Sequence, residues 1–123
     1  MRVFLDTSVL VDHLRTLREA TDYIDSLEDR PFCSEVSRIE IIQGLRSPER
    51  RDAEALFALV EWIEVNEAIA RRAGELGRQW RRSHSGIGVA DLAVAATVEH
   101  LETSLATCNV KHFPMFPGLQ APY

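Results

Sequence analysis

Three acidic residues occupy positions where a purely structural sequence rarely places a charge. Asp6 ends the apolar run of residues 3–5, Glu40 interrupts a run of isoleucines, and Asp91 lies in the apolar stretch of residues 89–96. Clustered carboxylates raise one another's pKa unless a cation holds them. Their hard oxygen ligands select Mg²⁺ or Mn²⁺, and such an ion stabilises charge on a phosphate. This chemistry suits hydrolysis of phosphodiester bonds.

Each acid also has a structural interpretation. Asp6 and Asp91 both precede or open an apolar helical pattern, where a carboxylate favours the N-cap. A buried position would be costly for Asp91, which lies in line with Val94 and Val98. Burying an ionised carboxylate there costs several kcal/mol unless it is paired or bound to a metal. Glu40 by local pattern alone belongs to a solvated helix face with Gln43, as most helical glutamates do.

The elements that would position these acids alternate between short strands and helices. Such a pattern predicts an α/β fold in one domain, residues 1–123, with a parallel sheet covered on both faces. In such sheets ligands gather beyond the carboxyl ends of the strands, where Asp6 would lie. Strands are predicted at residues 3–5, 32–33, 62–65 and 104–107. Helices are predicted at residues 8–15, 18–29, 67–82 and 89–102. Two more helices are predicted, one that begins after the cap candidates Ser34 and Ser37 and one that begins at Ser47. A small edge strand is predicted within residues 113–118.

Composition bounds the class of protein without identifying its partner. The chain has 123 residues, 27% charged and 46% hydrophobic, which is ordinary for a folded protein. Its net charge of -5 opposes nucleic-acid binding, but five of its arginines lie between Arg71 and Arg82. No apolar run approaches the roughly 20 residues of a membrane span, and no signal peptide is apparent, so we expect a cytoplasmic protein. Cys33 and Cys108 fit no metal-ligand spacing and are expected to be unbridged, although a disulfide stays open.

Four stretches together resemble the PIN-domain family, and within it the VapC-type toxins of bacterial toxin–antitoxin pairs. They occur in the family's order and at its spacings over essentially the whole chain. None of them is specific alone. The stretches are Phe4-Leu5-Asp6-Thr7-Ser8-Val9-Leu10, Ser37-Arg38-Ile39-Glu40, Asp91-Leu92-Ala93-Val94-Ala95-Ala96-Thr97 and Thr107-Cys108-Asn109-Val110-Lys111-His112-Phe113.

The resemblance implies a compact three-layer α/β/α fold with a short, mainly parallel central sheet. It also implies a homodimer with Mg²⁺-dependent endoribonuclease activity on single-stranded or loop RNA. Asp6, Glu40 and Asp91 match the family's three principal metal-binding acids, which reverses the local interpretation of Glu40. Where the family often has a fourth acid, this chain has Asn109, so we expect a one-metal mechanism.

The remaining site expectations concern positioning and RNA contact. By the resemblance, Ser8 and Thr107 orient the acids or metal-bound waters. The basic candidates for phosphate contacts are Arg78, Arg81, Arg82 and Lys111, although a solvated helix face explains the arginines equally well. The family further implies a VapB-like antitoxin whose tail lies over the acidic groove.

Two other classes of protein compete with this interpretation. Asp6 after an apolar strand is similar to the nucleophile of haloacid dehalogenase phosphatases, but these want a second Asp where the chain has Ser8. The stronger alternative is a non-catalytic RNA-binding or interaction module of PIN fold, motivated by the missing fourth acid. No Ser–His or Cys–His nucleophile pair, P-loop or zinc motif is present.

Overall fold

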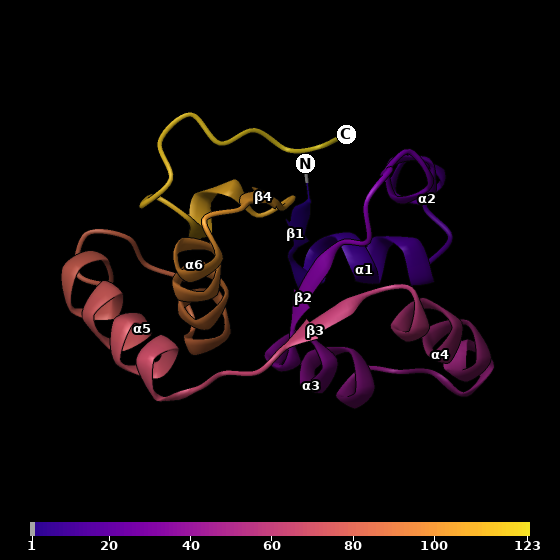
Figure 1. The fold of residues 1–123 in the computed structure, drawn as a ribbon, viewed down its shortest axis with the longest axis horizontal. Helices are drawn as coiled ribbons and strands as arrows, with labels where there is room; N and C mark the ends of the chain where they lie inside the picture. Colours follow the sequence, from indigo (N-terminus) through magenta and orange to yellow (C-terminus); the bar gives the residue numbers. More distant parts are fainter. Residues whose placement is uncertain (1) are drawn as a thin grey trace.

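The computed structural model describes residues 2–123, and within them four short strands form one parallel sheet (Figure 1). The strands are β1 (Val3–Leu5), β2 (Phe32–Ser34), β3 (Glu61–Ile63) and β4 (Ser104–Ala106), in the order β3-β2-β1-β4. All three strand pairs are parallel, and Phe4 at the centre pairs with Phe32 on one side and Leu105 on the other. The predicted parallel α/β sheet is confirmed.

Helices connect the strands and cover both faces of the sheet, as parallel crossovers require. They are α1 (Thr7–Leu14), α2 (Arg18–Asp25), α3 (Glu35–Gln43), the short 3₁₀ turn η1 (Ser47–Glu49), α4 (Arg50–Ala58), α5 (Glu67–Trp80), α6 (Val89–Leu101) and the 3₁₀ turn η2 (Val110–His112). Figure 1 shows α5 and α6 on one side of the sheet and α1, α2 and α4 on the other.

Alternation along β1 divides the core into two halves. Val3 and Leu5 pack with α1 and α4, whereas Phe4 faces the cluster of α5 and α6. Successive strand residues point to opposite faces, so one three-residue strand serves both layers. Phe4 and Leu5 have no exposed surface. This is the three-layer α/β/α arrangement that the resemblance implied.

Side chains at the helix starts explain where several helices begin. The Ser34 hydroxyl accepts a hydrogen bond from the Val36 amide at 3.1 Å, so Ser34 rather than Ser37 caps α3. Asn66, which the sequence did not single out, caps α5 by accepting from the Ile69 amide at 2.9 Å. Each cap satisfies an amide that would lack a partner inside its helix.

Several local expectations were wrong. Residues 113–118 form no strand in the described chain; they are turns held by Phe113, which is buried, and by backbone bonds such as Phe116 N–H to Phe113 O. Helix α2 ends at Asp25 rather than Asp29. Helix α6, by contrast, is buried from Leu92 to Val98, as its apolar sequence predicts, and only its first turn differs, since Val89 is 75% exposed.

Two further sequence expectations concern cysteines and membranes. Both cysteines are free, Cys33 within the core and Cys108 half-buried near the end of β4. Burial raises the pKa of the Cys33 thiol, which therefore stays protonated. Among residues 2–123 no helix has the length and apolar character needed to span a bilayer.

Candidate functional site

The candidate site lies where the order of the strands changes direction. From β1, the next two strands along the chain, β2 and β3, are added in order on one side. The last strand, β4, pairs with the other side of β1. The crevice beyond the carboxyl ends of two such strands is the usual ligand site of an open α/β sheet. Asp6 directly follows β1 and Thr107 directly follows β4. The topology therefore brings these two side chains together across the switch point.

Asp6 is held by two hydroxyls. Thr107 Oγ1 donates to Asp6 Oδ2 at 2.7 Å, and Ser8 Oγ donates to the same oxygen at 3.1 Å. These hydroxyls in turn accept backbone amides, Cys108 N–H on Ser8 and Asn109 N–H on Thr107. Because each hydroxyl oxygen already accepts an amide, its proton is directed to the carboxylate. Thr107 and Ser8, the predicted positioning residues, thus both contact Asp6, and they donate to the same carboxylate oxygen.

Asp6 is the most buried acid of the candidate site. Its relative exposure is 4%, and although it occupies the N-cap position of α1, its side chain makes no capping hydrogen bond. Burial raises the pKa of the Asp6 carboxyl, hydrogen bonds from Thr107 and Ser8 oppose the shift, and the charge of Asp91 adds to it. A buried carboxylate repelled by a second one favours either a proton or a cation. The capping interpretation of Asp6 therefore fails.

Glu40 lies on the exposed face of α3 and turns toward the start of α1. Thr7 Oγ1 donates to Glu40 Oε1 at 2.7 Å and lies 2.7 Å from the Oγ of buried Ser37. The local pattern was right about exposure, because Glu40 is solvated, as are its neighbours Ile39 and Ile42. The Thr7 contact nevertheless ties Glu40 to the residue next to Asp6.

Asp91 serves both as a helix cap and as a wall of the site. Its Oδ2 accepts the Gly88 amide at 2.9 Å, which closes the first turn of α6. The same oxygen lies 3.2 Å from His112 Nδ1, and its side chain is 18% exposed. The capping and functional interpretations are therefore compatible, because one carboxylate satisfies a backbone amide and also borders the site.

These acids border one pocket of about 360 Å³. Its lining is mostly polar and comes from the end of β1, from α1, α3 and α6, and from the segment after β4: Asp6, Thr7, Ser8, Val11, Asp12, Glu40, Asp91, Cys108 and Asn109. All three predicted acids, Ser8 and Asn109 are thus brought together by the fold. Thr107 lies behind them, fully buried.

Asp12 is a member of this pocket that the sequence reasoning missed. Tyr123 donates its hydroxyl to Asp12 Oδ2 at 2.6 Å, and Cys108 Sγ lies 3.6 Å from the same oxygen. The signal was available, because Asp12 follows Ser8 by four residues and so shares its helix face. The Tyr123 contact, however, joins residues 111 positions apart and has no local signature.

The donor set fits a hard divalent cation. The pocket offers carboxylates and hydroxyls, and Asp6 and Asp91 repel each other within it. Mg²⁺ is commonly bound by one or two carboxylates, with water completing its shell. Within residues 2–123, no three acidic, His or Cys side chains converge tightly enough to hold an ion by themselves. Such a set favours an ion held by few protein ligands.

The predicted basic contacts divide into two places. Lys111 is exposed in η2, two residues beyond the pocket residue Asn109. Arg78, Arg81 and Arg82 instead line a different groove between α5 and α6, together with apolar residues such as Val65 and Val89. The fold does not bring these arginines into the acidic pocket.

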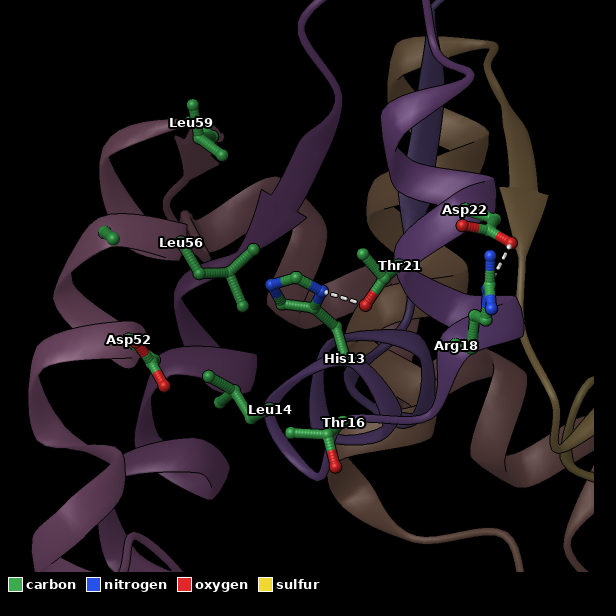
Figure 2. A pocket seen from close by; sticks show the side chains of 10 residues that line it. His13, Leu14, Thr16, Arg18, Thr21, Asp22, Asp52, Leu56 and Leu59 are labelled. Carbon is green, nitrogen blue, oxygen red and sulfur yellow. Dashed lines mark hydrogen bonds and ion pairs between the residues drawn. The ribbon is translucent and has the colours of Figure 1, made fainter.

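A second large pocket, of about 570 Å³, lies between α1, α2 and α4 (Figure 2). His13 Nδ1 lies 2.8 Å from Thr21 Oγ1, and Arg18 pairs with Asp22 at 3.8 Å. The pocket shares no lining residue with the acidic one. Its acids are Asp22, which is paired with Arg18, and Asp52, so it offers no set of carboxylates comparable to the acidic pocket.

Comparison with known proteins places this geometry in a family. Residues 3–114 match the PIN domain model. Ribonuclease VapC10 of Mycobacterium tuberculosis is 43% identical over 98% of this chain and 92% of its own. A toxin–antitoxin complex from Klebsiella pneumoniae has a similar chain, with a TM-score of 0.82 and 25% identity over 98% of both chains. VapBC-1 from nontypeable Haemophilus influenzae aligns with a TM-score of 0.75 and 27% identity, covering 98% of this chain and 96% of that one.

The match covers nearly the whole chain and includes every element that contributes to the acidic pocket. The family model, the order of the strands and the similar solved structures therefore agree with the resemblance seen in the sequence. The chain belongs to the PIN domain family.

Proposed function

We propose that this chain is a VapC-like toxin, a Mg²⁺-dependent endoribonuclease that cleaves single-stranded or loop RNA. The observation that carries the proposal is the convergence of Asp6, Glu40 and Asp91 on one pocket at the sheet's switch point. The 43% identity to a protein named ribonuclease VapC10, over nearly the full chain, supports the same activity. Mn²⁺ is the expected substitute for Mg²⁺ because it accepts the same oxygen ligands.

The residues of the pocket have separate tasks in this proposal. Asp6 and Asp91 would hold the ion, and Glu40 would bind it or orient the attacking water. A divalent ion there would supply positive charge against the phosphate and make nearby water more acidic. Ser8 and Thr107 fix Asp6 by donating to its Oδ2 and oppose the rise in its pKa, and neither hydroxyl bonds to its Oδ1. Asn109 brings no charge, so one ion is the expected number.

The same proposal covers partners and assembly. We propose a VapB-like antitoxin as the inhibitor, since two of the similar folds come from toxin–antitoxin assemblies. An inserted antitoxin arginine would pair with the clustered carboxylates. A cytoplasmic homodimer is proposed as well, and the exposed Val65 and Val89 beside the α5–α6 groove offer apolar surface for a second copy.

The test is cleavage of single-stranded RNA by Asp6→Asn and Asp91→Asn variants in Mg²⁺, with Asp25→Asn as the control. Asp25 is an exposed acid on α2 outside the pocket, so its variant should cleave like the wild type. Both pocket variants should lose cleavage while their circular dichroism stays native. Chelation of divalent ions should abolish wild-type cleavage, and added Mg²⁺ should restore it.

The competing function is a non-catalytic RNA-binding module of PIN fold. Asn109 in place of an acid, and the absence of a tight three-residue ligand cluster in residues 2–123, favour it. This alternative predicts that wild-type protein binds RNA but leaves it intact in Mg²⁺ and in Mn²⁺. Unchanged cleavage by both Asp→Asn variants would also refute the metal-nuclease mechanism.

A further inference from the structure

Two arginines are held in fixed positions around one carboxylate at the far end of α1. Arg15 Nε donates to Glu49 Oε2 at 3.0 Å, and Arg46 Nε lies 3.4 Å from Glu49 Oε1. The Arg46 amide donates to that oxygen as well, at 2.9 Å. The Glu49 side chain is only 13% exposed, so this carboxylate acts as an internal anchor for both guanidinium groups.

The cluster carries excess positive charge. One carboxylate faces two guanidinium groups, and the Arg15 and Arg46 side chains remain 44% and 63% exposed. Arg50 and Arg51 follow at once, both exposed. In a chain with net charge -5, such a local excess of arginine attracts anions. Each anchoring contact uses Nε, and a guanidinium has further N–H donors for a phosphate.

The cluster adjoins the acidic pocket. A small hollow of about 30 Å³ is bordered by Arg15 and Glu49, and Val11 and Glu40 line both this hollow and the acidic pocket. Ser8 of α1 lines the acidic pocket and Arg15, which directly follows α1, lies at the cluster, about 10 Å further along the helix axis. An RNA strand with one phosphate at the carboxylates would reach the arginines within a few nucleotides if it ran past Glu40.

We propose that Arg15 and Arg46 form a phosphate-binding site for the RNA strand that extends from the acidic pocket past Glu40. The site takes a phosphodiester group of single-stranded RNA and reads no base, since phosphate contacts carry no sequence information. This inference rests on the proposed function, because it takes RNA as the ligand. It replaces the α5 arginines as the main basic contact, since those lie in another groove.

A purely structural role makes a different prediction. The Arg15–Glu49 pair joins the end of α1 to η1, so it could serve only to fix that loop. Replacing Glu49 by Gln removes the same ion pairs but leaves both positive charges in place. The structural role predicts equal damage from Glu49→Gln and from loss of the arginines, whereas the phosphate site predicts opposite effects on RNA affinity.

The experiment measures binding of a fluorescein-labelled single-stranded RNA by anisotropy without divalent metal, over a range of salt concentrations. For the double variant Arg15→Gln/Arg46→Gln we expect about ten-fold weaker binding and a salt slope smaller by about 1.4, from two lost contacts on a single strand. Glu49→Gln should bind RNA as tightly as the wild type or more tightly. Arg71→Gln/Arg72→Gln is the matched control, because it removes two arginines that are ion-paired to Glu67 and Glu99 on the α5 side, and it should keep the wild-type slope.

Three results would overturn the site. The first is an equal loss of RNA affinity in Glu49→Gln and in the double variant. The second is an equal loss of RNA affinity in the Arg71/Arg72 control. The third is binding of an oligoglutamate peptide of the same charge that is as tight as RNA binding and depends on the same arginines. Cleavage in Mg²⁺ is measured in parallel, and the double variant should raise KM with kcat nearly unchanged. A wild-type protein that binds RNA in this manner without cleaving it refutes the proposed nuclease but leaves the phosphate site intact.

Discussion

Replacing Thr107 by Val tests whether hydroxyl donation opposes the rise in the pKa of buried Asp6. Thr107 Oγ1 donates to Asp6 Oδ2 at 2.7 Å, and Val keeps the shape while removing that donor. A hydrogen bond to a charged group contributes roughly 1.5–3 kcal/mol and one between neutral groups about 0.5–1.5 kcal/mol. The variant should therefore lose about 1 kcal/mol more stability with Asp6 ionised than with Asp6 protonated.

The sign of the pH dependence follows from the direction of the pKa shift. Burial raises the pKa of Asp6 above its unfolded value of about 3.9, so the native state binds more protons between the two values. The Asp6 contribution to stability is thus most favourable below the unfolded pKa and declines as pH rises through the folded pKa. Without Thr107 the folded pKa of Asp6 rises further, because a hydrogen bond that favours the charged form is lost.

The assay is urea unfolding of metal-free protein at a series of pH values from acidic to neutral. The destabilisation caused by Thr107→Val should grow with pH, and Thr107→Ser should restore wild-type behaviour by keeping the hydroxyl. Thr97→Val is the control, because Thr97 is equally buried but donates to the Ala93 carbonyl, which does not titrate. A destabilisation by Thr107→Val that is the same at every pH would refute the reasoning.

Four other predictions follow from the same contacts. Asp6→Asn in metal-free buffer should raise the free energy of unfolding at neutral pH, by about 1 kcal/mol, because it removes a buried charge; urea titration checks it, and lower stability would contradict it. Phe4→Ala should cost about 3–5 kcal/mol, since Phe4 has no exposed surface and contacts the α5–α6 core; a loss under 1 kcal/mol would show that the site relaxes. Gly74→Ala should stabilise α5 by up to about 1 kcal/mol, because the added Cβ meets nothing within 4 Å. Gly77→Ala should stabilise it less, because the added Cβ would lie 3.0 Å from Leu92 Cδ1. Thermal unfolding of the two variants checks the difference. Mg²⁺ at about 100 times its Kd should raise wild-type stability by about 2.7 kcal/mol and leave Asp6→Asn nearly unchanged, as calorimetry would show.

Exposure and long-range contacts set the limit of what local patterns could predict at the site. Glu40 was assigned to the site only through the resemblance, since its local pattern indicated a solvated face and it is indeed solvated. Asp91 was ambiguous between cap and site, and the structure shows that one carboxylate does both. Arg78, Arg81 and Arg82 were chosen as a dense run of charge, but they line a different groove, and no residue of α5 lines the acidic pocket.

The sequence by itself determined the elements and the kind of chemistry. Apolar runs such as residues 3–5, ended abruptly by Asp6, specify short buried strands with polar groups at their carboxyl ends, because periodicity and capping are local properties. Which polar groups meet there was decided only by the tertiary structure. Thr107 reaches Asp6 across 101 residues, and Arg15 reaches Glu49 across 34, because strand order and helix packing are set by burial of the whole core. No local sequence pattern predicts these two contacts, and both the pKa of Asp6 and the proposed phosphate site depend on them.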